Sequence, residues 1–248
     1  MILLALDTCD ARGSVAVLRD GDALQTVAHD TGDDYSVWLL PTIGRALAGS
    51  GVTFGDVDTY VAATGPGSFT GVRVGLATVK AWAEVSRKPI VAVSRLEAMA
   101  TEANGSPAAA GYVAAFANAQ RRQIFGALYR RQAERLERVG EEAVIAPEKF
   151  FAWTRENSGG ELIHWISTDP EMLTETEIWA ARQTDGAVTV VGWGVQAASP
   201  VLAPAIGRLG YRLAKLGRFT DPLALDANYV RRADAEVAWS DRNSKAAG

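Results

Sequence analysis

The sequence predicts an α/β protein made of two half-domains, each a mixed sheet flanked by helices. Strand-like and helix-like segments alternate from the first residue until the turn-rich stretch Asn104-Gly105-Ser106-Pro107, after which strand-like segments resume. We therefore expect an N-terminal half-domain at 1–104, a C-terminal half-domain at 105–235 and a tail at 236–248. An amphipathic helix within 203–218 is expected to pack back onto the N-terminal half-domain.

The N-terminal half-domain should open with three consecutive antiparallel strands. Apolar, β-branched runs predict strands at 2–6, 14–18 and 23–28, and Asp20-Gly21-Asp22 has the composition of a hairpin turn. Helical and strand patterns then alternate. We expect a helix at 36–48 that contains Pro41, a strand at 59–63, a helix at 71–85, a strand at 89–93 and a helix at 94–103.

The pattern of the C-terminal half-domain is weaker. Strands are expected at 111–117, 123–129 and 188–191, with an extended segment at 137–145 and a final strand at 228–232. Helices are expected at 147–156 and 203–216. The stretch 168–183 fits neither pattern and receives no assignment.

Composition narrows the class of protein. The chain has 248 residues, 48% of them apolar, which is enough for a substantial core. Its net charge of −4 offers no long-range attraction for a polyanion, so we expect no tight binding of nucleic acid by the chain alone, and any RNA contact should be local or made through another protein. The single cysteine excludes an internal disulfide. Without a signal peptide or a long apolar run, the protein is expected to be cytoplasmic and to have no membrane partner.

The most informative segment is a glycine-rich loop between the strand at 59–63 and the helix that follows it. It could cradle an anion at a helix N-terminus, or it could be a tight turn that brings two backbones together. The loop has neither a Walker lysine nor the glycine spacing of a dinucleotide site, so its chemistry favours the packing turn. Ser68 or Thr70 can cap the helix. The motif loop comprises Gly65, Pro66, Gly67, Ser68, Phe69, Thr70, Gly71 and Arg73.

This loop and several shorter pieces occur in the order and spacing of a known family. The matching pieces are Leu6-Asp7-Thr8, Ser14-Val15-Ala16-Val17, Leu39-Leu40-Pro41, residues 65–75, Val93-Ser94-Arg95-Leu96-Glu97-Ala98 and Tyr229-Val230-Arg231. With these pieces the chain resembles the TsaB (YeaZ) family of bacterial tRNA threonylcarbamoyladenosine biosynthesis subunits, most firmly over residues 1 to 100.

The element order β-β-β-α-β-α-β-α is similar to the ribonuclease-H-like half-domain of the actin and sugar-kinase (ASKHA) superfamily. In that superfamily, residues at the position of Asp7 and Thr8 face nucleotide phosphate and metal, although a turn retained without that role explains them as well. The resemblance implies a non-catalytic paralogue of TsaD, the subunit that transfers a threonylcarbamoyl group to adenosine 37 of tRNA.

The resemblance also implies partners: TsaD, the ATPase TsaE and, when TsaD is absent, a second copy of this chain. No cofactor is expected in this subunit itself, although ATP or ADP could bind at the seam of the assembled complex.

The chain carries no recognisable catalytic or metal-binding residues. The catalytic relative holds its metal with a His-x-x-x-His pair, whereas His29 and His164 are the only histidines here and lie far apart in sequence. Tyr35 stands where the family often has histidine, and Thr64 where it often has arginine. Residues 118–122 replace the usual Asp-Ala-Arg. The alternative is an independent ATP- or metal-dependent enzyme of the M22 glycoprotease type, for which only Asp7 is well placed.

The first two predicted helices carry apolar residues on two sides, and a single sheet can cover only one. We expect their outer sides to dock TsaD, although an ordinary layer buried within the monomer remains the alternative. The Arg121-Arg122 and Arg231-Arg232 pairs could touch tRNA phosphates or simply be solvated. The expected interface comprises Val37, Trp38, Pro41, Arg45, Val74, Thr78, Ala81, Trp82 and Val85.

Overall fold

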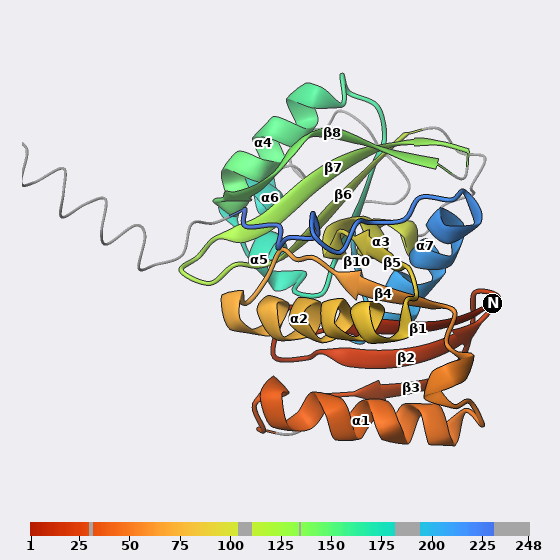
Figure 1. Ribbon diagram of the computed structural model, residues 1–248. Helices are drawn as coiled ribbons and strands as arrows, with labels where there is room; N and C mark the ends of the chain where they lie inside the picture. Colours follow the sequence, from red (N-terminus) through yellow and green to blue (C-terminus); the bar gives the residue numbers. More distant parts are fainter. Residues whose placement is uncertain (30–31, 104–110, 134, 182–193, 231–248) are drawn as a thin grey trace, which may run out of the picture.

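Two five-stranded sheets of the same topology form the molecule, with helices between them and on their outer faces (Figure 1). The computed structural model describes residues 1–29, 32–103, 111–133, 135–181 and 194–230. This architecture confirms the predicted α/β class and the two ribonuclease-H-like half-domains. Within the described residues, no helix combines the length and the apolar character needed to cross a membrane.

The first sheet has the strand order β3-β2-β1-β4-β5. Strands β1, β2 and β3 are antiparallel neighbours, whereas β4 and β5 run parallel to β1. β1 and β4 are almost wholly buried because helices cover both faces of the sheet, which is why their sequences are apolar runs. The strands are β1 Ile2–Asp7, β2 Ser14–Arg19, β3 Asp22–Ala28, β4 Thr59–Ala63 and β5 Ile90–Val93.

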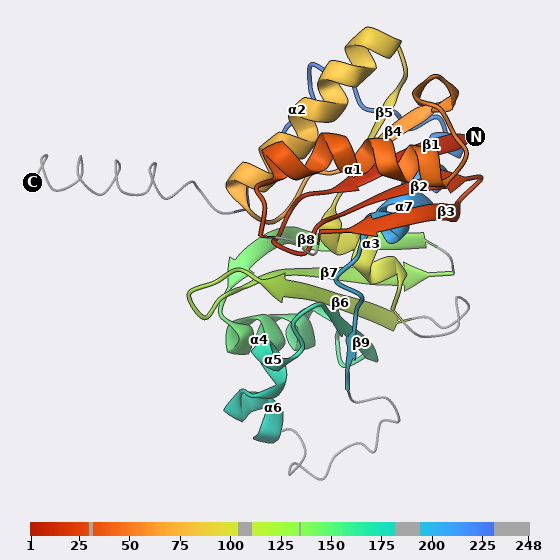
Figure 2. The same ribbon diagram turned by 90° about the horizontal axis from the view of Figure 1, so that it is seen from below.

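Helices α1 (Tyr35–Gly49) and α2 (Phe69–Ser86) lie side by side on one face of the first sheet (Figure 2). Ser68 caps α2, because its Oγ accepts a hydrogen bond from the Gly71 amide. A short 3₁₀ turn, Phe54–Asp56, precedes β4 and was not expected. Helix α7 (Ala203–Lys215) packs on the opposite face, against β1 and β2.

The second sheet, in the order β10-β9-β6-β7-β8, repeats the arrangement of the first. Helix α3 (Arg95–Thr101) lies between the sheets and contacts both α7 and the second sheet. Helix α4 (Pro147–Asn157) covers the outer face, beside α5 (Glu171–Thr174) and α6 (Glu177–Ala181). The strands are β6 Gly111–Asn118, β7 Ile124–Gln132, β8 Arg135–Ile145, β9 Ile163–Ser167 and β10 Val195–Ala197.

The structure corrects the sequence analysis mainly in the second half. Strands β9 and β10 were missed, and the unassigned stretch holds α5 and α6. The final strand was wrong for Asn228–Val230: only the Asn228 amide reaches a neighbouring strand region, at the Thr64 carbonyl, while the next two amides bond within a local turn. The 104–107 boundary, the 188–191 strand, residues 231–232 and the 236–248 tail lie outside the described residues.

Candidate functional site

The glycine-rich loop packs directly on the turn that follows β1. A Cβ atom at Gly67 would lie 2.0 Å from the Cys9 carbonyl oxygen, and one at Gly71 would lie 2.1 Å from the Thr8 carbonyl oxygen. The Ser68 amide also donates to the Cys9 carbonyl, at 2.5 Å. Gly65 has a φ of +108°. Close approach of two backbones therefore accounts for the glycines of this loop.

Asp7, at the carboxyl end of β1, has both carboxylate oxygens occupied. One accepts from the Cys9 amide at 2.9 Å, and the other accepts from Arg95 Nε at 3.1 Å. Both side chains are buried, with Asp7 0% and Arg95 2% exposed, and the guanidinium also pairs with Asp10. Thr8 Oγ1 donates to the Gly71 carbonyl at 2.7 Å. The Asp-Thr pair is thus committed to internal contacts, including an ion pair.

Further ion pairs and hydrogen bonds connect this ion pair to the second half-domain. Arg12 Nη2 lies 3.5 Å from Asp10 Oδ2 and 2.8 Å from Asp169 Oδ1, and Arg12 Nη1 donates to the Thr168 carbonyl. The Asn118 amide donates to the other oxygen of Asp169 at 3.1 Å. Although burial raises the pKa of Asp169, the donors Thr168, Asn118 and Arg12 outweigh it and the pKa is lowered. We call this chain of contacts the interlobe ion network.

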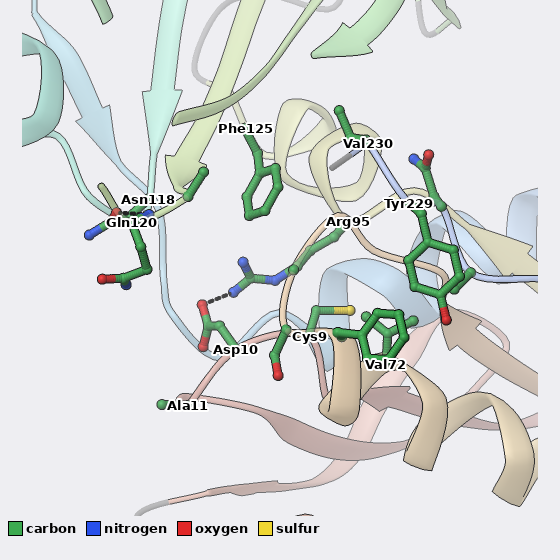
Figure 3. Close-up of a pocket in the computed structure, with 16 residues that line it drawn as sticks. Cys9, Asp10, Ala11, Val72, Arg95, Asn118, Gln120, Phe125, Tyr229 and Val230 are labelled. Atoms are coloured by element: carbon green, nitrogen blue, oxygen red, sulfur yellow. Dashed lines mark hydrogen bonds and ion pairs between the residues drawn. The ribbon is translucent and has the colours of Figure 1, made fainter. Parts of the chain in front are cut away.

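A cavity of about 320 Å³ opens beside this network, between the half-domains (Figure 3). The motif loop and the start of α2 form one wall, and the β6–β7 turn and the segment after α7 form the others. The interlobe pocket is lined by Cys9, Asp10, Ala11, Gly67, Ser68, Phe69, Val72, Arg95, Asn118, Ala119, Gln120, Phe125, Ala227, Asn228, Tyr229 and Val230.

Two motifs that are far apart in sequence meet at the edge of this pocket. Arg73 Nε donates to the Tyr229 hydroxyl at 2.7 Å, and its guanidinium lies 3.7 Å from the centroid of the Phe69 ring. The centroids of the Phe69 and Tyr229 rings are 5.1 Å apart. The sequence singled out Phe69 and Arg73 in the motif loop and Tyr229 in a distant piece, but contained no signal that Tyr229 touches the other two.

The two histidines lie in different half-domains. His29 follows β3, where its ring nitrogens contact the carbonyls of Ala11 and Asp33. His164 is on β9, and burial, with a smaller contribution from Arg131, lowers its pKa. No group of three or more His, Cys, Asp or Glu side chains suited to a metal occurs among the residues that the structure describes.

Cys9, the single cysteine, is buried, and Tyr35 is half-buried. The pKa of the Cys9 thiol is raised well above its usual value by burial and by Asp7, so this thiol stays protonated. Tyr35, at the position of the family histidine, has its pKa raised by burial and by Asp7. Its hydroxyl bridges the turn after β1, donating to the Asp10 carbonyl and accepting from the Gly13 amide.

The outer sides of α1 and α2 expose apolar residues. Val37 is 66%, Leu40 56% and Val85 83% exposed, and Pro41 and Ala81 are exposed as well. Val74, Thr78 and Trp82 are half-buried. Trp38, in contrast, is 5% exposed and packs against His29 and Tyr35, so its ring lies on the inner side of α1 and not on the outer side. We define the α1–α2 face as Val37, Leu40, Pro41, Gly44, Arg45 and Ala48 with Val74, Ala77, Thr78, Ala81 and Val85.

Charge is almost absent from the α1 part of this face. Of the eight exposed residues of α1, only Arg45 is charged; the others are Ser36, Val37, Leu40, Pro41, Gly44, Ala48 and Gly49. A helix that stays in contact with water normally carries charged and polar residues on its outer side.

Comparison with known proteins gives a consistent result. Residues 27–239 match the family model described as TsaD: tRNA N6-adenosine threonylcarbamoyltransferase. The chain is 27% identical to the TsaB biosynthesis protein of Bacillus subtilis over 96% of this chain and 98% of that protein. It is 32% identical to TsaB of Escherichia coli over 67% of this chain and 70% of that protein.

Among solved structures, YeaZ from Pseudomonas aeruginosa matches with a TM-score of 0.66 and 25% identity, covering 92% of this chain and 100% of that one. The match extends through both half-domains, so the similarity is not confined to the glycine-rich loop. The chain belongs to the TsaB (YeaZ) family of tRNA threonylcarbamoyladenosine biosynthesis proteins.

Proposed function

We propose that this chain is a non-catalytic subunit of the complex that makes threonylcarbamoyladenosine at position 37 of tRNA, and that it docks the catalytic subunit TsaD through the α1–α2 face. TsaE is the further partner, and a second copy of the chain occupies the face when TsaD is absent. The protein acts in the cytoplasm and reaches tRNA through the complex. The observation that carries the proposal is the largely apolar outer side of α1, where Arg45 is the one exposed charged residue.

The composition of the face suits a closely packed helix pair. Gly44 lies in the middle of α1, and a Cβ there would meet nothing within 4 Å, so the isolated chain does not require glycine at this position. Glycine inside a helix costs about 1 kcal/mol relative to alanine. Together with Ala48, Ala77 and Ala81, Gly44 allows the backbone of a partner helix to approach closely.

The buried ion pair supports the non-catalytic part of the proposal. An actin-like enzyme needs a carboxylate at the end of β1 that faces metal and phosphate, whereas both oxygens of Asp7 are bonded within the chain, one of them to Arg95. The subunit accordingly needs no cofactor of its own, and a nucleotide in the complex would bind at the seam with TsaD.

The docking face can be tested with Ala81→Glu, which places a charge at an exposed small position of α2. Ala152→Glu is the matched control, because Ala152 is an exposed alanine on α4, in the other half-domain. Sedimentation with TsaD from the same organism should show loss of the complex for Ala81→Glu only, with both variants melting within a few degrees of the parent. Retained association in a folded Ala81→Glu variant would reject this face.

The rival function, an independent ATP- or metal-dependent enzyme, is tested separately. Titration calorimetry of the isolated chain with ATP and Mg²⁺ should show no binding at micromolar concentrations. Micromolar binding would favour an enzyme, and Asp7→Asn should then abolish it.

A further inference from the structure

We propose that the interlobe pocket is a binding site for an uncharged nucleobase that bears a carbonyl group, such as guanine or uracil. The inference goes beyond the docking function, because it concerns a ligand of this chain alone and a different part of its surface. Its basis is Arg95, a buried cation with N–H donors that have no acceptor among the described residues.

The guanidinium of Arg95 is only partly used by its neighbours. Nε donates to Asp7 and Nη2 to Asp10, but Nη1 has no acceptor within the described part of the chain. The side chain is 2% exposed and lines the pocket, and in Figure 3 its end lies among the lining residues, beneath Phe125. A buried N–H group without a partner is destabilising, so an acceptor placed there is favoured.

The charges around the pocket argue for a neutral acceptor. Arg95 is already balanced by Asp7 and Asp10, and Arg12 by Asp10 and Asp169. The interlobe ion network therefore sums to −1, from three carboxylates and two guanidiniums. A phosphate or carboxylate beside Nη1 would be repelled by Asp10, whereas a carbonyl oxygen would not.

The remaining walls fit a flat ring with polar edges. Phe125 lies on one side of Arg95 and Tyr229 on another, which provides aromatic surface for stacking (Figure 3). The side-chain amide of Gln120 can donate a hydrogen bond to the edge of a base and can accept one from it. Guanine presents O6 and N7 as neighbouring acceptors and uracil presents O4, whereas adenine presents an amino group beside N7. The pocket should therefore discriminate against adenine.

The rim of the pocket adds positive charge. Gln120, Arg121 and Arg122 form the β6–β7 turn with φ values of +63°, +54° and +58°, a left-handed conformation that is unfavourable for non-glycine residues. Arg121 and Arg122 are exposed, and so is Arg73 beside Phe69. The base could belong to a free nucleoside or to unpaired RNA, whose phosphates would then contact these rim arginines.

Titration calorimetry of the isolated, full-length chain tests the site. Guanosine and uridine should bind saturably, and adenosine should bind at least tenfold more weakly. Gln120→Ala should weaken guanosine binding, whereas Gln132→Ala, at the other end of β7, should not. Arg95→Lys keeps the charge but removes the Nη1 donors, so it should weaken guanosine and uridine by at least tenfold in protein whose folding is verified by its melting curve.

A second set of titrations tells whether the bound base belongs to a free nucleoside or to RNA. If the base belongs to RNA, hexauridylate should bind more tightly than uridine, with a salt dependence that Arg122→Ala reduces and Arg19→Ala, at the opposite end of the first sheet, does not. If hexauridylate binds no more tightly than uridine, the ligand is a free nucleoside. Absence of saturable guanosine and uridine binding up to about 10 mM would overturn the proposal, as would equal affinity for adenosine. Neither result would affect the docking of TsaD.

Discussion

Helices α1 and α4 occupy equivalent positions in the two half-domains, yet their outer sides differ. Each follows the third strand of its sheet and packs on that sheet. The exposed side of α4 carries Glu148, Lys149, Arg155 and Glu156, as a helix in water should, whereas α1 exposes one charged residue. Since both helices have the same structural task within the monomer, that task does not explain the apolar side of α1, and this difference supports the proposed docking of a partner there.

The turns after the first strand of each half-domain differ in a similar way. The last residue of β1 is the charged Asp7, which requires the buried Arg95 as counter-ion. The last residue of β6 is the uncharged Asn118, whose side chain accepts a hydrogen bond from the backbone amide of Gln120 within the turn that follows. At this position the first half-domain therefore depends on a buried charge pair, whereas the second has an uncharged residue that bonds within its own turn. Four experiments can break or sharpen these two comparisons.

The largest effect is expected from Arg95→Met. It removes the partner of a fully buried carboxylate and should lower the free energy of unfolding by about 3–5 kcal/mol. Urea denaturation followed by circular dichroism measures this loss. Asn118→Ala, at the corresponding position of the second half-domain, is the comparison and should cost about 1 kcal/mol. Equal losses in the two variants would contradict the assigned role of the ion pair.

The next largest effect on stability is expected from Gly75→Ala. A Cβ at Gly75 would lie 2.4 Å from Thr8 Oγ1, which is held by its bond to the Gly71 carbonyl. Despite the better helix propensity of alanine, the crowding should destabilise the protein by about 1–3 kcal/mol. The same denaturation assay applies, and unchanged stability would mean that the motif loop and the β1 turn are not closely packed.

Gly44→Ala should have the opposite sign in the isolated chain. Its Cβ would lie in open space, so α1 gains helix propensity and the free energy of unfolding should rise by about 0.5–1 kcal/mol. If a partner helix packs against this position, the same variant should bind TsaD less tightly. Stabilisation together with unchanged TsaD affinity would place the docking surface elsewhere on α1 or α2.

The smallest effects concern pH. Burial raises the pKa of Glu142, although Ser94, Tyr129 and Asn228 donate to its carboxylate, so its contribution to stability is largest at low pH and falls as pH rises above the unfolded value of about 4.3. The lowered pKa of Asp169 acts oppositely: its contribution is present above about pH 4 and is lost below it.

Urea titrations from about pH 3 to 7 at constant ionic strength should separate the two carboxylates. Glu142→Gln should reduce the decline of stability toward neutral pH, to which Glu97 with its raised pKa also contributes, and Asp169→Asn should reduce the loss at acid pH. A parent-like pH profile in either variant would show that the carboxylate does not titrate as assigned.

The elements that the sequence analysis located correctly are those with strong local signals. β1, β2 and β4 are continuous apolar runs, and Ser68 stands in front of a long helical pattern. β9 was missed because Ile163–Ser167 is short and lacks strict alternation, and the segment at Asn228 was taken for a strand on its β-branched and aromatic composition. The glycine density of the motif loop was recognised, but the backbone that it packs against was not.

Only part of the candidate site could be predicted from local sequence signals of this kind. Asp7, Phe69, Arg73 and Tyr229 were each noticed, whereas the role of Arg95 was not. An arginine directly after a helix cap in an otherwise apolar stretch is a signal for a buried ion pair, but its partners lie more than eighty residues away in sequence. Trp38 was placed on the interface by its apolar character, although the packing of its ring turns it inward.

Local patterns alone determined the half-domain architecture, the family and the apolar character of α1 and α2, since periodicity and motif spacing depend only on neighbouring residues. Tertiary structure decided which side of each helix remains exposed, how Arg95 and Arg12 connect the half-domains, and where a pocket opens between them. These features depend on contacts between residues distant in the chain, which arise only when both sheets and their helices have packed together.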